Sequence, residues 1–224
     1  MIELRDVRKA FNQGRPNEFW AIRGVSLSLE ANRITVLKGP SGSGKTTLLS
    51  MIGCLARPTE GRILLEDRLL SGLPERFLTE IRRQTFGFIF QQFNLIKGLS
   101  VLENVMLPAY PRGGPRRALE AGAHELLAQF GLGDKAEYRV EWLSGGEAQR
   151  TAICRALING PRVLIADEPT ANLDTARSRD FMRIVGELKA AGKTVLLTSH
   201  DPEVYDAPQV DRVIEMRDGR VAGG

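Results

Sequence analysis

The sequence predicts an α/β fold in which a mainly parallel sheet is covered by helices on both faces. Short apolar runs with the length of buried strands alternate with segments of helical periodicity, as strands covered on both sides require. A glycine-rich turn follows one apolar run and two acids follow another, which is where open parallel sheets bind ligands. Of the 224 residues, 42% are hydrophobic and 26% charged, which indicates a globular domain.

The first 90 residues contain several short strands and one helix. The predicted elements are strands at residues 2–7, 21–29 and 33–39, a helix from Lys45 that stops before Pro58, an edge strand or hairpin at 61–70, and a buried strand at 86–90. The segment at 33–39 is a short apolar run that ends in a glycine-rich turn, and the segment at 86–90 is expected to be a buried strand. The strand at 21–29 alternates and is expected to have one exposed face.

Residues 91–155 have helical patterns and no convincing strand. The predicted helices lie at 100–107, where Ser100 and Glu103 form a capping box, at 117–130, and after Ser144, where Glu147 completes a second capping box. The segment 110–117 is rich in proline and glycine and is expected to be a loop. We therefore predict an inserted helical subdomain at 91–155, with a core formed by residues 1–90 and 156–224.

Strand–helix alternation resumes after the insertion. The predicted elements are a buried strand at 162–166, an amphipathic helix at 176–191, a buried strand at 194–199, a helix capped by Asp201, and a hairpin at 212–221 with an Asp-Gly turn. Each helix after a strand brings the chain back to begin the next parallel strand. This part of the chain therefore completes the parallel sheet.

Residues 39–46 read GPSGSGKT and match the phosphate-binding sequence G-x-x-x-x-G-K-[ST] in full. The motif follows a predicted strand and opens a helix, which is the context that its mechanism requires. The loop's N–H groups bind phosphate, Lys45 brings charge to the β- and γ-phosphates, and Thr46 offers a hydroxyl to Mg²⁺. The residues expected to bind ATP here are Gly39, Pro40, Ser41, Gly42, Ser43, Gly44, Lys45, Thr46 and Thr47.

Three polar residues follow core strands. Asp167 and Glu168 come directly after one strand, and His200 follows another. Adjacent acids here either form a turn into the next helix or act in catalysis, with Asp167 on Mg²⁺ and Glu168 polarising a water. Because parallel strands bring their carboxyl ends to one edge, His200 is expected beside Glu168 and the γ-phosphate. The alternative for His200 is an ordinary boundary residue.

The segment LSGGEAQR at 143–150 contains two glycines that a capped helix does not need. Gly145 and Gly146 lie in the first turn, where each costs about 1 kcal/mol relative to alanine. Glycines at a helix N-terminus let an anion approach the backbone N–H groups closely. The segment therefore predicts a second phosphate contact about a hundred residues after the first.

These motifs together resemble the nucleotide-binding subunit of an ABC transporter, and the resemblance covers essentially the whole chain. In the family's order they are Walker A at 39–46, a Q-loop at Gln91, the signature at 143–147, Walker B at 163–167, the catalytic Glu168, a D-loop at 171–174 and the switch His200. The resemblance implies one ABC ATPase domain with a P-loop NTPase (RecA-like) core, an N-terminal antiparallel β subdomain and the helical insertion.

The resemblance also implies a homodimer in which each ATP lies between two copies of the chain. The expected catalytic residues are Lys45, Gln91, Glu168 and His200, and those expected to organise Mg²⁺ are Thr46, Gln91 and Asp167. Ser144, Gly145 and Gly146 would contact the ATP of the other copy, and Asp174 would link the two sites. Phe11 matches the aromatic residue that stacks on adenine, with Phe19 and Trp20 as rival candidates.

Within the superfamily, the resemblance is closest to the ATPases of lipoprotein release and macrolide export. The segments that carry it are residues 39–61, 88–108 and 166–174. It implies that ATP-driven dimerisation and hydrolysis power a separate integral membrane permease that does mechanical work on its substrate. A cell-division ATPase coupled to cell-wall hydrolysis is the alternative, and a soluble non-transport ABC ATPase is less favoured.

Composition limits the partners and the location. The formal net charge is only +4, and the basic clusters at 82–84 and 111–117 have no interleaved aromatic residues, so no nucleic-acid partner is expected. No apolar run approaches the roughly 18 residues needed to cross a bilayer. We expect a chain that is soluble in isolation and, given the resemblance, peripheral on the cytoplasmic face of the inner (plasma) membrane.

Overall fold

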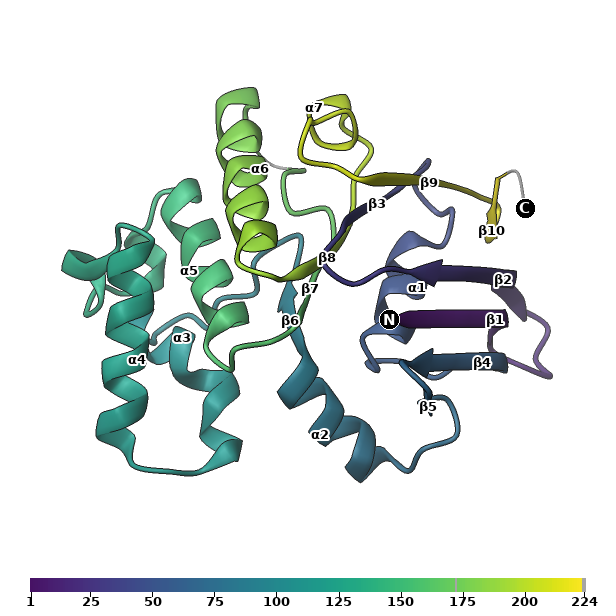
Figure 1. Cartoon of the computed structure of the whole chain (residues 1–224), viewed down its shortest axis with the longest axis horizontal. Helices are drawn as coiled ribbons and strands as arrows, with labels where there is room; N and C mark the ends of the chain where they lie inside the picture. Colours follow the sequence, from purple (N-terminus) through teal and green to yellow (C-terminus); the bar gives the residue numbers. More distant parts are fainter. Residues whose placement is uncertain (172, 223–224) are drawn as a thin grey trace.

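The computed structural model describes residues 1–171 and 173–222. These residues form a six-stranded sheet, a four-stranded antiparallel sheet and a group of helices (Figure 1). The helices α3, α4 and α5 lie at one end of the molecule and the antiparallel sheet at the other, with β6, β7 and β8 of the six-stranded sheet between them. The predicted fold class is confirmed.

The six-stranded sheet forms the centre of the fold, in the order β10-β9-β3-β8-β7-β6. Its strands are β3 (Ile34–Lys38), β6 (Phe86–Ile89), β7 (Val163–Ala166), β8 (Thr194–Thr198), β9 (Arg212–Arg217) and β10 (Arg220–Val221). All except β10 run parallel, and β10 pairs with β9 across the predicted Asp-Gly turn. The carboxyl ends of β3, β7 and β8 therefore meet at one edge.

The antiparallel sheet has the order β2-β1-β4-β5. Its strands are β1 (Ile2–Phe11), β2 (Phe19–Leu29), β4 (Glu60–Leu65) and β5 (Arg68–Leu69). Strands β1 and β2 extend further toward their connecting turn than predicted, because Phe11 pairs with Phe19. The added residues, 8–11 and 19–20, include charged and aromatic types. They do not show the alternation of apolar and polar residues by which the strands were predicted.

Helix α1 (Lys45–Ile52) lies between the two sheets, and its Leu48, Leu49, Met51 and Ile52 are buried in a core shared by both. The helix ends earlier than predicted. A Cβ at Gly53 would lie 2.5 Å from the Phe88 ring, and Cys54 has a positive φ of 59°, which no helix continues. The turn therefore begins at Gly53, where the chain passes closest to β6.

Helix α2 (Glu75–Thr85) was not predicted. Its buried residues are only Leu78, Ile81 and Thr85, and the rest of the sequence ERFLTEIRRQT is mostly polar. These buried residues have the three- and four-residue spacing of a helix. They are too few to distinguish the segment from a polar loop in the sequence. The helix begins after Pro74, which cannot donate a backbone hydrogen bond and so marks a start.

Helices α5 (Gly145–Leu157), α6 (Thr175–Ala190) and α7 (Pro202–Tyr205) pack on the other face of the parallel sheet. Their buried contributions include Ile153, Phe181, Ile184, Val185 and Val204. Both faces of the sheet are thus covered, as its apolar strands require.

The helical insertion has its own small core. It contains α3 (Val101–Met106), η1 (Leu107–Arg112), α4 (Arg116–Gln129), η2 (Gly133–Lys135), η3 (Val140–Trp142) and most of α5. Between residues 91 and 155 the described residues form no strand, apart from an isolated bridge between Ser100 and Arg139. The expected loop at 110–117 is wrong in part, because a 3-10 helix extends to Arg112 and α4 begins at Arg116.

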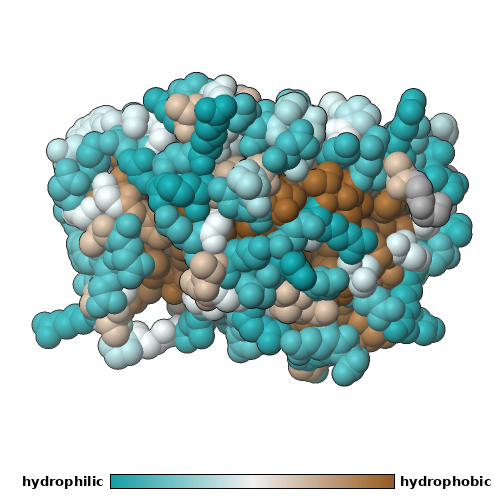
Figure 2. All heavy atoms as spheres, turned by 45° about the horizontal axis from the view of Figure 1, so that its top comes forward, coloured by the Kyte–Doolittle hydropathy of each residue, from teal (hydrophilic) through white to brown (hydrophobic). Residues whose placement is uncertain are grey.

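Polar residues cover most of the face drawn in Figure 2, with apolar residues visible between them. Among residues 1–171 and 173–222, no helix combines the length and apolar character that a membrane crossing needs.

Candidate functional site

The phosphate-binding loop after β3 is shaped by close backbone approaches. Gly39 has φ 152°, and a Cβ there would lie 2.1 Å from the carbonyl oxygen of Met216. Gly44 has φ 98°, and its Cβ would lie 2.7 Å from the carbonyl oxygen of Ala21. Both positions therefore require glycine, because the loop is pressed against β9 on one side and β2 on the other.

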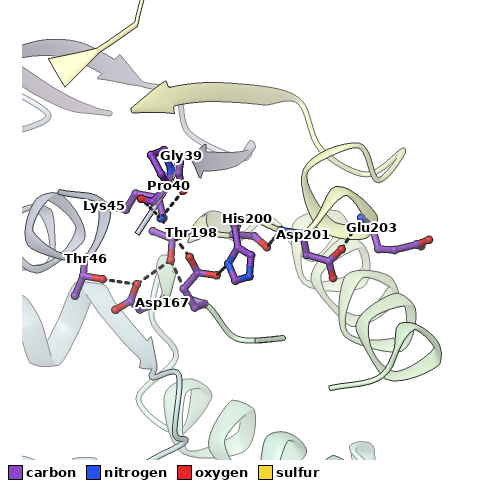
Figure 3. Close-up of polar contacts among 11 residues, drawn as sticks. Gly39, Pro40, Lys45, Thr46, Asp167, Thr198, His200, Asp201 and Glu203 are labelled. Carbon is purple, nitrogen blue, oxygen red and sulfur yellow. Dashed lines mark hydrogen bonds and ion pairs between the residues drawn. The ribbon is translucent and has the colours of Figure 1, made fainter. Parts of the chain in front are cut away.

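Lys45 points its ammonium group into the mouth of this loop (Figure 3). Its Nζ donates to the carbonyl oxygens of Gly39 at 2.8 Å and Pro40 at 3.2 Å. The same Nζ lies 3.4 Å from Oε1 of Glu168, and the Lys45 side chain is only 7% exposed. The ammonium is therefore held in place at the loop, where its positive charge is suited to bind an anion such as phosphate.

Asp167, directly after β7, contacts residues of α1, β8 and β6. Its Oδ1 accepts from Thr46 Oγ1 at 3.0 Å and from Thr198 Oγ1 at 2.8 Å, and its backbone N–H donates to Ile89. Thr198, the last residue of β8, was not predicted, because no motif marks a threonine inside an apolar strand. The carboxylate is thereby fixed beside the hydroxyl that opens α1 (Figure 3).

The oxygen atoms of Asp167 and Thr46 fit Mg²⁺. Hard oxygen ligands suit this ion, which commonly takes one or two carboxylates and completes its shell with phosphates and water. No cluster of three or more His, Cys, Asp or Glu residues with metal-binding geometry occurs in the described part of the chain. The residues present thus suit a cation that arrives with a nucleotide better than a closed protein site.

Glu168 and His200 lie together at the same edge. Glu168 has φ 45°, an uncommon conformation for a non-glycine residue, and its backbone N–H donates to Thr198 Oγ1 at 2.8 Å. Its Oε2 lies 3.0 Å from Nδ1 of His200. A strained backbone held by the neighbouring strand is common at functional sites, and here it points the carboxylate toward Lys45.

An open cleft of about 1060 Å³ connects these groups to the antiparallel sheet. It is lined by Phe11, Phe19, Trp20, Ala21, Arg23, residues 40–47, Gln91, Glu168, His200, Asp218 and Gly219. Phe11 and Phe19 stack with ring centroids 5.3 Å apart, so the predicted aromatic residue and one rival lie side by side. Arg23, Asp218 and Gly219 were missed, since no motif marks them.

The signature segment lies outside this cleft. Ser144 Oγ accepts from the N–H of Glu147, and Glu147 Oε2 accepts from the N–H of Ser144 at 2.8 Å, which confirms the capping box. Gly145 is exposed and Gly146 partly so. Lys135 donates to Glu147 Oε1 and fixes the cap from outside. The turn is therefore held by its cap, and residues 144–146 do not line the cleft that contains the chain's own phosphate loop.

The Glu147 contacts predict a pH dependence of stability. The hydrogen bond from Lys135, followed by those from Ser144, lowers the pKa of the Glu147 carboxyl from 4.5 to about 2. A lowered folded-state pKa stabilises the fold above about pH 4.5, and this contribution disappears as the pH falls toward 2. Urea unfolding should show wild type more stable than Glu147→Gln at neutral pH, with a gap that closes in that window.

Lys135→Met should show the same closing gap, because it removes the partner that lowers the pKa. A stability difference between wild type and Glu147→Gln that stays constant from pH 7 to pH 3 would contradict this assignment.

Asp174 caps α6, where its Oδ1 accepts from the N–H of Arg177 at 2.9 Å. Its side chain is 61% exposed and also lies 3.5 Å from the Arg177 guanidinium. Within the predicted D-loop at 171–174, Asn172 lies outside the described residues. Asp174 does not line the nucleotide cleft of its own chain.

The sequence and fold were compared with known proteins. The family described as "ABC transporter" matches residues 22–171. A lipoprotein-releasing system ATP-binding protein LolD of Cereibacter sphaeroides is 42% identical over 99% of this chain and 98% of its own length. A macrolide export ATP-binding/permease protein MacB of Hyphomonas neptunium is 44% identical over 99% of this chain. The chain spans about one third of the length of that relative and of several others it matches.

Solved structures agree. The bacterial ABC transporter cassette MJ0796, described as dimeric, superimposes with a TM-score of 0.89 at 38% identity, covering 99% of this chain and 97% of that one. The same cassette in a post-hydrolysis state, bound to ADP and Pi, also gives 0.89, at 39% identity. The chain therefore belongs to the ABC transporter family, in which it is an ATPase cassette.

Proposed function

We propose that this chain binds ATP with Mg²⁺ and hydrolyses the ATP to ADP and phosphate while two copies hold the nucleotide between them. The observation that supports this best is the meeting of Lys45, Asp167, Glu168 and His200 at one sheet edge, where Lys45, Glu168 and His200 also line a single cleft. The cleft offers a cation for phosphate, a carboxylate for the attacking water and aromatic rings for a base.

The roles follow from the contacts. Lys45 and the backbone N–H groups of residues 41–47 bind the phosphates, and the Phe11–Phe19 pair offers a face to adenine. Thr46, Asp167 and Gln91 would hold Mg²⁺, which supplies charge to offset the phosphate oxygens. Glu168 accepts the proton of the attacking water as general base, and His200, 3.0 Å from its carboxylate, orients it.

The dimer is supported by the placement of the signature. Ser144 and the two following glycines lie outside the cleft, yet they form an ordered helix start suited to an anion. A similar cassette is described as dimeric. A second copy placed head to tail would bring this turn to the γ-phosphate, and Asp174 would lie near the junction of the two sites.

Ser144→Arg tests this arrangement. The larger cationic side chain should block closure of the dimer and leave ATP affinity of the monomer within about twofold of wild type, because Ser144 does not line the cleft of its own chain. Equilibrium nucleotide binding and ATP-dependent dimer formation by light scattering measure the two effects. Ser144→Ala, which removes the hydroxyl and its cap at about 1 kcal/mol but adds neither bulk nor charge, is the matched control. Loss of ATP binding by the Ser144→Arg monomer would refute the shared site.

The membrane partner we propose is an integral permease of the lipoprotein-release or macrolide-export type, served from the cytoplasmic face. Relatives carrying both names match nearly all of this chain, and some of them join a permease to the cassette in one polypeptide. The test is the protein that co-purifies from membranes. Four membrane-spanning helices with a large extracytoplasmic domain would support the proposal. A cell-wall hydrolase complex would support the cell-division alternative.

A further inference from the structure

Arg155, in the last turns of α5, is a buried cation with no carboxylate beside it. Its side chain is 9% exposed. Nη1 donates to the carbonyl oxygen of Asn94 at 2.6 Å, and Nη2 donates to that of Phe93. Burial alone lowers the pKa of this guanidinium, and no ion pair to it occurs among the described residues. Placing a charge here is costly, so its two backbone contacts call for an explanation.

The segment that Arg155 holds is strained and lies next to the nucleotide cleft. Phe93 has φ 57° and Asn94 has φ 48°, so two successive non-glycine residues are left-handed. Such conformations persist only where the surroundings hold them. Gln91, two residues before Phe93, lines the cleft. The guanidinium therefore clamps the turn that follows Gln91.

Helix α5 has a second buried contact to the catalytic edge. Gln149, which is 4% exposed, donates from Nε2 to the carbonyl oxygen of Pro169 at 3.0 Å. Pro169 directly follows Glu168. The same helix begins at the signature turn, where Ser144 is the cap. One rigid helix thus contacts the turn after Gln91, the turn after Glu168 and, at its start, the surface proposed to bind the second ATP.

We propose that Arg155 is a positioning residue that fixes the turn after Gln91 to the signature helix, so that ATP bound in the cleft sets the orientation of the signature turn. This inference rests on the proposed ATP-dependent dimer. Without the two hydrogen bonds from Arg155, the turn at 93–94 relaxes. The orientation of the signature turn then no longer depends on whether ATP is bound in the cleft. ATP still binds the monomer, because Arg155 does not line the cleft.

The test uses Arg155→Lys and Arg155→Met in the full chain. Lysine keeps the charge but cannot form the two-pronged contact, and methionine removes both. We expect kcat to fall about tenfold for lysine and further for methionine, while monomer affinity for ATP changes less than about threefold. In a Glu168→Gln background, the ATP concentration for half-maximal dimer formation should rise in the same order.

Cys154→Ala is the matched control. Cys154 is the preceding residue on α5 and is fully buried in the core of the helical insertion, where its Sγ lies 3.7 Å from the carbonyl oxygen of Leu126 and makes no hydrogen bond to Phe93 or Asn94. It should lower thermal stability by a similar amount and leave kcat and dimer formation near wild type. If Cys154→Ala and Arg155→Lys lose kcat and dimer formation equally, Arg155 is a stability residue and the inference is wrong. Wild-type protein that neither hydrolyses ATP nor dimerises would instead refute the proposed function.

Discussion

Glu168→Gln is expected to lower kcat for ATP hydrolysis by about 10²–10⁴-fold, the range that a general base contributes. The change is nearly isosteric, so the contact with His200, 3.0 Å away in wild type, has room to persist. Thr198 holds the backbone N–H of residue 168, so the side chain keeps its direction. ATP should still bind, because the phosphate loop and Lys45 are unchanged.

The same variant should accumulate as an ATP-bound dimer, because the step that separates the copies is removed. Phosphate release measures kcat, and size-exclusion chromatography with ATP measures the dimer. Glu215→Gln is the matched control, since Glu215 is 54% exposed and pairs with Lys38. A Glu168→Gln chain that stays monomeric at saturating ATP and turns over normally would remove Glu168 from its proposed role.

The parts of this site that sequence reveals are those fixed by local backbone geometry. The phosphate loop is recognisable because its glycines are needed where the backbone contacts Met216 and Ala21, and the spacing to Lys45 follows. The paired acids are recognisable because they end a continuously apolar strand. Parallel strands must deliver such residues to one edge, which places His200 beside Glu168 without knowledge of the full fold.

The parts that sequence does not reveal depend on contacts between distant segments. Thr198 binds Asp167 from 31 residues away, and Arg155 reaches Asn94 across 61 residues. Neither residue belongs to a sequence motif. In the sequence alone, Thr198 is one more residue of a strand and Arg155 one more residue of a helix. Helix α2 was missed for a related reason. Its stability comes from packing of its few buried residues against the rest of the protein and not from its own mostly polar sequence.

Lys45→Ala is expected to weaken ATP binding at least about 30-fold, since truncating one member of a buried charge pair costs roughly 2–5 kcal/mol. The Lys45 ammonium is 7% exposed and fixed by Gly39, Pro40 and Glu168, so it is oriented before phosphate arrives. Binding is measured by fluorescence of Trp20, which lines the cleft, in a Trp142→Phe background.

Lys38→Ala is the control for this change. Lys38 ends β3 immediately before the phosphate loop, but its ammonium pairs with Glu215 and lies over the Tyr205 ring, outside the cleft. Lys38→Ala therefore removes a lysine that is close to Lys45 in the sequence but makes no contact with the phosphate-binding loop's cleft. If Lys45→Ala binds ATP as tightly as Lys38→Ala, the ammonium is a structural partner of Glu168 and the loop binds phosphate by its backbone alone. If only Lys45→Ala loses affinity, the Lys45 ammonium contributes directly to ATP binding, and its contact with Glu168 orients it without replacing the phosphate.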